Sequence, residues 1–314
     1  MVPNSVLNVV VTYIMSKYLI SIVGPTAIGK TALSIELANY FNTEIISADS
    51  RQFYKEMSIG TAAPTPTELQ SAKHHFIHHK SIENSYSVGD FERDSIGKLD
   101  VLFKKNNVVI MVGGSGLYID AVIKGLDYFP DVDSSIRIDL NYKLEKEGLE
   151  SLQKELKLLD PETYNAIALD NPHRVIRALE VCIGAELPYS SFLNQEKGKR
   201  NFKTITIGLK ADREIIYNRI NKRVDIMIEN GLLDEVKTLE TKQHLNALNT
   251  VGYKELFKYV SGDWTLDFAI SEIKKNSRRY AKRQLTWFKK NTETLWFDYE
   301  DSTDIIIKHI ESII

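Results

Sequence analysis

Residues Ile20 to Thr31 read Ile-Ser-Ile-Val-Gly-Pro-Thr-Ala-Ile-Gly-Lys-Thr, and this stretch decides the fold. The apolar run Tyr18 to Val23 predicts a buried strand, and the apolar residues after Thr31 recur at helical spacing. Between them, residues 24–31 match G-x-x-x-x-G-K-T, the pattern of a P-loop, in the strand–loop–helix context that the pattern requires. The sequence therefore predicts a phosphate-binding loop at the carboxyl end of a strand.

The chemistry of this loop suits a diphosphate or polyphosphate ligand. Glycine near each end lets the backbone curl so that its N–H groups point inward, and the positive end of the following helix adds to their field. The ammonium of Lys30 can neutralise terminal phosphates, and the hydroxyl of Thr31 can bind Mg²⁺. The pattern does not distinguish ATP from another diphosphate. The predicted nucleotide- or diphosphate-binding residues are Gly24, Pro25, Thr26, Ala27, Ile28, Gly29, Lys30 and Thr31.

The composition of the 314-residue chain is that of an ordinary globular protein, with 43% hydrophobic and 26% charged residues. The length allows one large domain or two modest ones. A formal net charge of −2 gives no global signature of nucleic-acid binding, although a local basic stripe is enough to bind tRNA. The single cysteine, Cys182, excludes an internal disulfide and a cysteine-based zinc site, and we expect it to pack in the core of a helix.

The amino-terminal segment is not expected to direct the chain to a membrane. Val6 to Val23 is mostly apolar, but polar residues interrupt it, and it lacks a basic n-region and a small-residue cleavage site. A membrane span is disfavoured because the strand before the P-loop takes up residues 18–23. We therefore expect a cytoplasmic protein. We also expect residues 1–14 to be a non-native or disordered extension, with Met15 as the natural start.

Further strand–turn–helix units predict an α/β fold with a P-loop NTPase-like core, built on a doubly wound parallel sheet. Thr43 to Ala48 and Val108 to Val112 predict two more buried strands, and Thr204 to Leu209 predicts a strand that returns to the sheet. From Asp212 onward the pattern predicts long amphipathic helices. The expected domains are a core of residues 15–130 and 203–314, interrupted by an all-helical insertion of residues 131–202.

Asp49 follows the second predicted strand, at the sheet edge where open α/β sheets bind ligands. Its carboxylate can bind Mg²⁺ directly or through water, or act as a general base beside the phosphate site. It can also merely cap a turn, as aspartates at strand ends often do. Arg51 and Gln52 beside it carry donors that suit a base or a phosphate.

Two groups of basic residues at helical spacing can each clamp an anion. Arg219 and Arg223 stand four residues apart, so they project from one helix face. His173, Arg174 and Arg177 form H-R-x-x-R at the start of another predicted helix. On spacing alone, a solvated basic face is the simpler interpretation of both segments.

The predicted helix Leu266 to Lys290 is strongly basic and carries interleaved aromatic residues. Such a face suits a phosphate backbone with stacked bases, but a surface helix packed on a core looks similar, and the sequence favours neither. The basic residues are Lys274, Lys275, Arg278, Arg279, Lys282, Arg283, Lys289 and Lys290, and the aromatic ones are Tyr280, Trp287 and Phe288.

Histidines cluster at positions 74, 75, 78 and 79, where spacing of four residues would place a pair on one helix face, as in a metal site. No carboxylate or cysteine completes a ligand set, and short histidine tracts are weakly specific. We therefore expect no metal ion at His74, His75, His78 and His79.

Six blocks together resemble the tRNA dimethylallyltransferases, isopentenyltransferases that act on adenosine 37 beside the anticodon. The resemblance covers nearly the whole chain after residue 17, and the order and spacing of the blocks make it far more specific than a P-loop alone. The blocks are the loop 24–31, Asp49 to Gln52, Gly113 to Tyr118, His173 to Val181, Val251 to Tyr253, and Ala281 to Phe288.

The resemblance implies transfer of a dimethylallyl group from dimethylallyl diphosphate to N6 of adenosine 37, with release of diphosphate and with Mg²⁺ as cofactor. The P-loop would then hold the prenyl diphosphate rather than ATP. Lys30, Thr31 and Arg223 would act on the leaving diphosphate, with Thr31 as the metal ligand. Asp49 would be the general base that takes a proton from N6.

The resemblance also implies where tRNA binds, and that the helical insertion embraces the anticodon stem. Members of this family are commonly monomeric, so we expect a monomer. This sequence has His173 where the family usually has glutamine, and Asn249-Thr250 where some members have an Arg-Cys pair. The implied tRNA contacts are Asp49, Ser50, Arg51, Gln52, Ser115, Arg137, His173, Arg174, Val175, Ile176 and Arg177.

Three alternatives remain beside this interpretation. An adenylate isopentenyltransferase would use the same chemistry on a free nucleotide, but a mononucleotide needs neither the helical insertion nor the basic helix. A P-loop small-molecule kinase would turn over ATP. A simple tRNA-binding module would not explain the combination of Lys30, Thr31 and Asp49.

Overall fold

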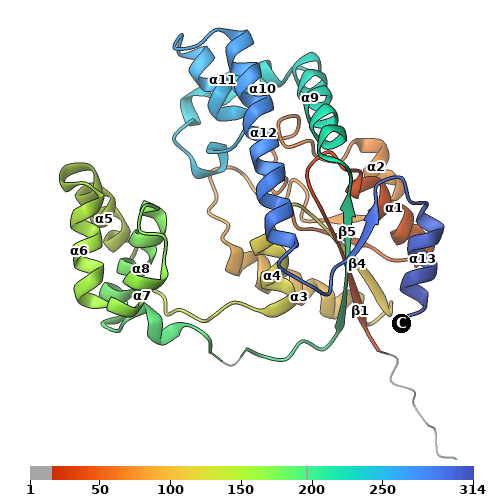
Figure 1. The fold of residues 1–314 in the computed structure, drawn as a ribbon, viewed down its shortest axis with the longest axis horizontal. Helices are drawn as coiled ribbons and strands as arrows, with labels where there is room; N and C mark the ends of the chain where they lie inside the picture. The colour runs from red at the N-terminus through yellow and green to blue at the C-terminus, as the bar shows by residue number, and fades with distance from the viewer. Residues whose placement is uncertain (1–15, 196) are drawn as a thin grey trace, which may run out of the picture. The chain divides into compact units, whose positions relative to one another are not determined.

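A parallel sheet of six strands forms the centre of the structure, a computed structural model that describes residues 16–195 and 197–314. In the central strand, Ile20 lies opposite Ile110 of one neighbour and Ile205 of the other. The strand order is β3-β2-β4-β1-β5-β6 (Figure 1). The strands are β1 (Tyr18–Val23), β2 (Ile45–Ser47), β3 (His74–His75), β4 (Val108–Val112), β5 (Lys203–Lys210) and β6 (Leu295–Asp298).

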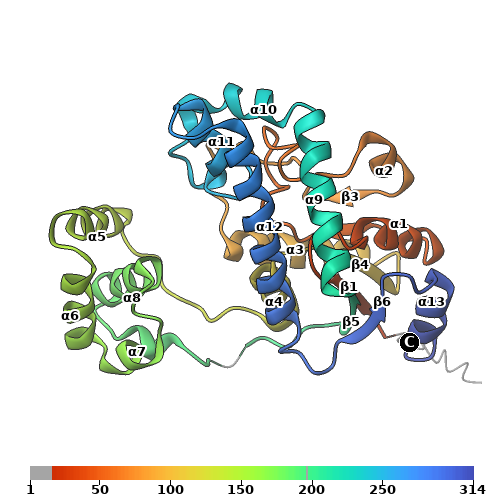
Figure 2. The same cartoon turned by 45° about the horizontal axis from the view of Figure 1, so that its top comes forward.

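Alternate residues of β1 pack into separate cores on the two faces of the sheet. Leu19 and Val23 join one core, which α3 (Val88–Leu102) and α4 (Gly116–Lys124) cover. Ile20 and Ile22 join the other core, with α1 (Lys30–Tyr40) and α13 (Thr303–Glu311). Helices therefore cover both faces (Figure 2), as a buried parallel sheet requires, and the predicted doubly wound α/β class is confirmed.

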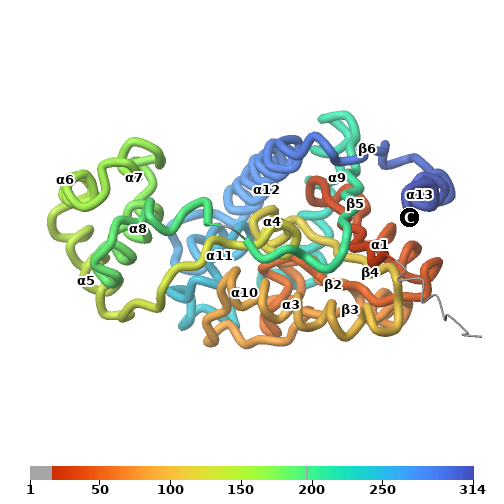
Figure 3. The backbone as a smooth tube through the Cα atoms, turned by 90° about the horizontal axis from the view of Figure 1, so that it is seen from below, coloured from red at the N-terminus to blue at the C-terminus, as the bar shows by residue number. Residues whose placement is uncertain are grey.

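The chain after β5 forms four helices, then β6 and α13. The helices α9 and α12 lie over the carboxyl side of the central strands in Figures 1 and 2. At the end of the chain, α13 lies beside α1 (Figure 3), where the Tyr40 hydroxyl donates to Glu311 Oε1 at 2.6 Å. The prediction of helices alone after Asp212 was wrong, because β6 adds a short edge strand to β5. The helices are α9 (Arg213–Glu229), α10 (Leu232–Thr238), α11 (Tyr253–Val260) and α12 (Leu266–Phe288).

Residues 124–199 form a second compact unit, and the rest of the described chain forms the first, which we call the P-loop core. Cys182 is buried in a helix of the second unit, as predicted. The predicted insertion of residues 131–202 overlaps this unit, and its role as a tRNA-contacting domain stays a prediction. The unit contains α5 (Ser134–Glu147), α6 (Leu149–Leu159), α7 (Pro161–Ala166) and α8 (Pro172–Ala185), packed around Leu140, Leu152, Leu156, Val175, Ile176, Ala178 and Leu179.

The expectations for the amino-terminal residues 1–14 and for Met15 fall outside the described residues. Within residues 16–195 and 197–314, no helix combines the length and apolar character that a membrane crossing needs.

Candidate active site

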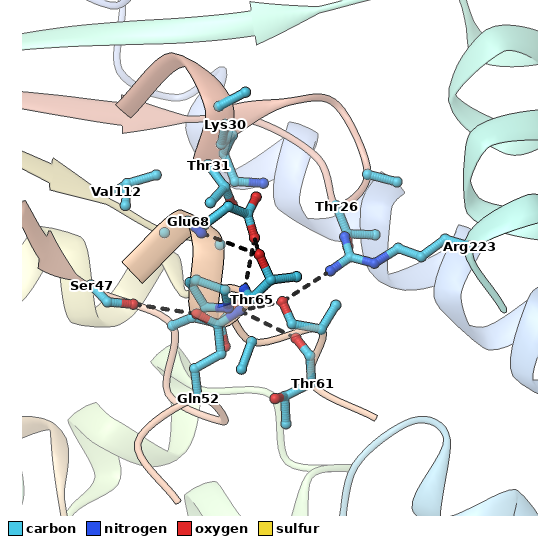
Figure 4. Close-up of a pocket in the computed structure, with 18 of the residues that line it drawn as sticks. Thr26, Lys30, Thr31, Ser47, Gln52, Thr61, Thr65, Glu68, Val112 and Arg223 are labelled. Atoms are coloured by element: carbon cyan, nitrogen blue, oxygen red, sulfur yellow. Dashed lines mark hydrogen bonds between the residues drawn. The ribbon is translucent and has the colours of Figure 1, made fainter. Parts of the chain in front are cut away.

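The P-loop opens a cavity of about 1050 Å³ at the carboxyl edge of the sheet. Gly24 leaves β1 with φ 142°, and a Cβ there would lie 2.8 Å from the carbonyl oxygen of Leu209 in β5, so the turn requires glycine. Figure 4 shows Lys30 and Thr31 at the start of α1 and Arg223 of α9 pointing into the cavity. Of the eight predicted loop residues, Thr26, Ala27, Ile28, Gly29, Lys30 and Thr31 line this cavity, while Gly24 and Pro25 contribute carbonyl groups behind it.

Lys30 is tied to the backbone of the P-loop by two hydrogen bonds. Its Nζ donates to the carbonyl oxygens of Gly24 at 3.1 Å and Pro25 at 2.8 Å, which leaves a third N–H for a ligand. Burial lowers the pKa of Lys30 to about 7, with a further lowering from the charge of Arg223 and an opposing effect of Asp49. A phosphate placed beside this ammonium would favour the charged form and raise the pKa again.

The low pKa of Lys30 makes diphosphate binding pH-dependent. Binding of the anion should be tightest below pH 7, where Lys30 of the free protein already carries its proton. The reason is that the anion binds the ammonium form of Lys30 better than the neutral amine. Above pH 7 the dissociation constant for the diphosphate ligand should rise about tenfold per pH unit, up to the pKa in the complex, because one proton is taken up on binding. Calorimetric titration across pH 6 to 9 measures this rise. Lys30→Arg is the control, since a guanidinium stays protonated and should give a flat profile above pH 7.

Two arginines of α9 contact the P-loop. Arg223 Nη1 donates to Thr26 Oγ1 at 3.2 Å, and its Nη2 donates to the carbonyl oxygen of Ala62 at 3.5 Å. Arg219 Nε donates to the carbonyl oxygen of Ala27 at 2.7 Å. Burial lowers the pKa of Arg223, although a guanidinium keeps its charge at any working pH. The solvated basic face that spacing favoured is therefore wrong for Arg223, which burial withdraws from solvent, whereas Arg219 is exposed and keeps one bond to the loop.

Asp49 lies at the same edge of the sheet, in the turn after β2. The turn comes close to the end of β4 because Gly113 has no side chain: a Cβ there would lie 2.4 Å from the carbonyl oxygen of Ala48. The Asp49 Oδ1 atom accepts the Arg51 N–H at 3.1 Å, so one oxygen does cap a turn. Within the described parts of the chain Oδ2 accepts no hydrogen bond, so the second oxygen is available to a ligand.

A second cavity of about 520 Å³ adjoins the P-loop cavity. Ser50, Arg51 and Arg283 line it, together with residues 249–252. Six residues line both cavities, so the two spaces meet where these side chains stand. They are Thr26, Asp49, Thr61, Arg223, Met227 and Tyr280.

The predicted residues around Asp49 are held by specific hydrogen bonds. The Ser115 Oγ accepts the Ser50 N–H at 3.0 Å and lies 3.0 Å from the Ser50 Oγ. The Arg51 Nη1 donates to the carbonyl oxygens of Asn246 and Ala247, each at 3.0 Å. These contacts join the turn after β2 to the start of α4 and to the loop before α11.

Gln52 faces the P-loop cavity rather than the second cavity. Its Nε2 donates to the carbonyl oxygens of Thr61 at 3.2 Å and Ala62 at 3.1 Å, and Ser47 Oγ donates to its Oε1 at 3.4 Å (Figure 4). The amide group therefore holds the loop that closes one wall of the cavity, and its predicted contact with tRNA stays a prediction.

Gln284 is a structural residue of the site that the sequence interpretation missed. Its Oε1 accepts the Thr26 N–H at 2.8 Å, and its Nε2 donates to the carbonyl oxygen of Gly114 at 2.9 Å. One buried amide of α12 thus joins the P-loop to the turn after β4. It stands in the block Ala281 to Phe288 that carries the family resemblance, but the interpretation considered only the charges and aromatic rings there.

Glu235 of α10 was also missed, and it organises the loop that begins at Ser58. Its Oε2 accepts the N–H groups of Ser58 at 3.0 Å and Ile59 at 2.8 Å, and its Oε1 accepts the Gly60 N–H at 3.0 Å. The Tyr253 hydroxyl donates to the same Oε1 at 2.6 Å. Four donors on one carboxylate fix a loop whose residues line both cavities.

Glu235→Ala should lower the free energy of unfolding by about 3 kcal/mol, because it removes the shared acceptor of four donors. Tyr253→Phe removes one of the four donors and should cost only about 1 kcal/mol. Urea denaturation followed by circular dichroism measures both. Equal stability of the Glu235 variant and the parent protein would show that the carboxylate does not hold the loop.

The basic helix α12 packs on a core along one part of its surface and exposes basic side chains along another, so each of the two interpretations left open by the sequence describes part of it. Phe288 is buried and packs in a core, while Lys274 pairs with Asp225 of α9 at 2.5 Å. Arg283 is exposed at the second cavity, and Trp287 Nε1 donates to Asp120 Oδ2 at 2.9 Å. Packing and ion pairs thus account for part of the helix, and the exposed charges remain available to a polyanion.

The other predicted tRNA contacts belong to the helical unit. His173 and Arg174 are exposed at the start of α8. Val175 and Ile176 are 0% and 2% exposed and pack in the core of the unit, and their predicted contact with tRNA stays a prediction.

Two arginines of this unit share one acidic partner. Arg137 donates to the Glu180 carboxylate at 3.0 and 2.6 Å, and Arg177 Nη1 donates to it at 3.0 Å. Burial opposes the effect, but these hydrogen bonds hold the pKa of Glu180 below its ordinary value. The simpler interpretation of a solvated basic face is therefore wrong for Arg177, which is paired and oriented.

The histidine cluster is not helical. His74 and His75 form β3, and the His75 Nε2 lies 2.5 Å from Glu44 Oε2. Within residues 16–195 and 197–314, no group of three or more His, Cys, Asp or Glu side chains is arranged to hold a metal ion. The spacing argument for a shared helix face therefore does not apply.

Known proteins resemble this chain over nearly its whole length. A model of the IPP transferase family matches residues 52–291. A protein of Christiangramia forsetii named tRNA dimethylallyltransferase is 62% identical, over 95% of this chain and 99% of its own. A protein of Flavobacterium johnsoniae with the same name is 60% identical, over 94% of this chain and 97% of its own.

Solved structures share the fold as well. The tRNA isopentenylpyrophosphate transferase of Bacillus halodurans is 38% identical with a TM-score of 0.70, covering 95% of both chains. A eukaryotic dimethylallyltransferase described as acting on tRNA is 26% identical with a TM-score of 0.78, covering 91% of this chain and 75% of its own.

Proposed function

Because the chain belongs to the IPP transferase family and is a prenyltransferase, we propose that it modifies adenosine 37 in the anticodon loop of tRNA. It transfers a dimethylallyl group from dimethylallyl diphosphate to N6 of the adenine and releases diphosphate. The observation that carries this proposal is the position of Asp49, which lines both the P-loop cavity and the second cavity. A donor in the first and an adenine in the second would meet at its carboxylate.

The P-loop cavity suits the diphosphate end of the donor. Backbone N–H groups of residues 27–31 and the start of α1 favour an anion, and Lys30 and Arg223 bring positive charge from two sides. As the allylic C–O bond breaks, negative charge grows on the leaving diphosphate. Fixed cations at that position lower the barrier because they interact more strongly with the transition state than with the bound donor.

The acceptor needs a base because the lone pair of an adenine N6 amine is delocalised into the ring. A carboxylate within hydrogen-bond reach orients the amine and takes its proton as the new C–N bond forms. The Asp49 Oδ2 atom would take this role, and the proposal is supported by its accepting no hydrogen bond from the described residues. The adenine is stacked in the anticodon loop, so it must be extruded to enter the second cavity.

Magnesium fits this site with help from the ligand. The Thr31 hydroxyl lines the cavity and has no hydrogen-bond partner among residues 16–195 and 197–314, so it can serve as one ligand. Mg²⁺ commonly combines one or two protein groups with substrate phosphates and water. Thr31 and the donor diphosphate would hold the ion, whose charge offsets that of the leaving group.

If tRNA is the acceptor, the protein also needs surfaces that contact the tRNA backbone. Exposed His173 and Arg174 of the helical unit, and the exposed charges of α12, would contact its backbone. A cytoplasmic monomer agrees with this role.

The experiment is transfer of radiolabel from dimethylallyl diphosphate, with unmodified tRNA, AMP or no acceptor in parallel. We expect label in tRNA, and its loss when adenosine 37 is replaced by guanosine. Label in AMP would instead identify an adenylate isopentenyltransferase. Consumption of ATP without label in either acceptor would identify a P-loop kinase and overturn the proposal.

A further inference from the structure

Tyr280 of α12 stands at the junction of the two cavities and has no role in the mechanism above. It lines both spaces, as does Asp49. Its hydroxyl lies 3.4 Å from the carbonyl oxygen of Gly114 and is within hydrogen-bond reach of the Ser115 side chain. The bond to the Gly114 carbonyl is long, so the hydroxyl can exchange it for a better acceptor at little cost.

The hydroxyl is a neutral donor beside an anionic acceptor. Burial raises the pKa of Tyr280 to about 12, and the negative charge of Asp49 adds to this effect. Both groups lie near Gly114. The Tyr280 hydroxyl contacts its carbonyl oxygen, and Asp49 Oδ2 lies 3.8 Å from the position that a Cβ would take on this glycine. The junction therefore presents one acceptor and one donor, both close to Gly114.

Adenine offers the complementary pattern around its reactive amine. The N6 amino group donates, and the ring nitrogens N1 and N7 that flank it accept. Guanine presents an acceptor, O6, at the position of the amine. An aspartate and a neutral phenol side by side would therefore accept from the amine and donate to a flanking ring nitrogen, and guanine would leave both groups poorly paired.

Resting on the proposed function, we propose that Tyr280 is a positioning residue for the acceptor: its hydroxyl donates to the ring nitrogen beside N6, N1 or N7, while Asp49 accepts from N6. The pair of hydrogen bonds orients the amine toward the allylic carbon. It also selects adenine over guanine at this point of the site.

The test combines Tyr280→Phe with single-atom changes in the base. Anticodon stem-loops carry adenosine, 1-deazaadenosine or 7-deazaadenosine at position 37, and kcat/KM is measured with the parent enzyme and the variant. We expect Tyr280→Phe to lower kcat/KM about tenfold on adenosine, the loss of one hydrogen bond. On the analogue that lacks the bonded nitrogen, the substitution should cause no further loss, whereas on the other analogue the tenfold loss should persist.

The identity of the insensitive analogue tells N1 from N7. An equal loss on all three bases would overturn the proposal, because a purely structural effect cannot depend on one base atom. Tyr217→Phe, on α9 and outside both cavities, is the matched control and should behave as the parent. If the parent enzyme labels no adenosine stem-loop, the proposed function fails; if it does and no coupling appears, only the role of Tyr280 fails.

Discussion

Replacing Asp49 with alanine is expected to lower kcat for tRNA prenylation about a thousandfold, because general-base catalysis by a positioned side chain contributes on that order. Affinity for tRNA should change little. The backbone turn survives in the variant, since Ser50 is held by Ser115 and Arg51 by two carbonyl groups. Single-turnover assays with saturating donor measure the chemical step, and filter binding measures affinity.

The control for this prediction is Asp234→Ala, which removes an exposed aspartate of α10 and should leave both quantities unchanged. Asp49→Asn keeps the shape and the bond to the Arg51 N–H but cannot take a proton, so it should be nearly as slow as the alanine variant. A variant with weakened tRNA binding and normal turnover of bound tRNA would remove Asp49 from the role of base.

The second large effect is expected at Lys30. Lys30→Ala should reduce kcat/KM for the donor about a hundredfold, the size of effect seen when one group that stabilises developing charge is lost. Arg223 and the loop N–H groups remain, so the donor should still bind. Inhibition by inorganic diphosphate should weaken in parallel, because Lys30 acts on the leaving group itself.

Lys104→Ala is the matched control, since this exposed lysine follows α3 and lies outside both cavities. Initial rates at varied donor concentration, with tRNA saturating, give the comparison. Unchanged donor kinetics in the Lys30 variant would show that the ammonium does not contact the leaving group.

The parts of the fold that the sequence predicts are those with a strong local signal. Tyr18 to Val23 and Val108 to Val112 are continuous apolar runs, and the structure has strands with those bounds. The edge strands were missed for the opposite reason. β3 has two residues and β6 has four, and both are strands only because a neighbour supplies the hydrogen bonds.

The same distinction holds for the candidate site. Gly24, Lys30 and Asp49 follow strand ends, so local patterns place them at one edge of the sheet. Glu235 and Gln284 act through contacts with residues far away in the sequence, and no spacing rule announces them. Spacing also could not tell that Arg223 is withdrawn from solvent while Arg219 stays exposed, with both bonded to the P-loop or its neighbour, because that depends on how α9 packs.

The strand order has a consequence for how the chain is made. β1 is flanked by β4 and β5, and the whole helical unit is encoded between these two neighbours. On the ribosome, one edge of β1 stays unpaired until Lys203 to Lys210 have emerged, long after β4 is available. An open apolar edge of this kind invites wrong partners. The helical unit has its own core, so it can fold before β5 is made. Its folding would shorten the flexible chain between β4 and β5, and pairing of β5 with β1 would then cost less loop-closure entropy.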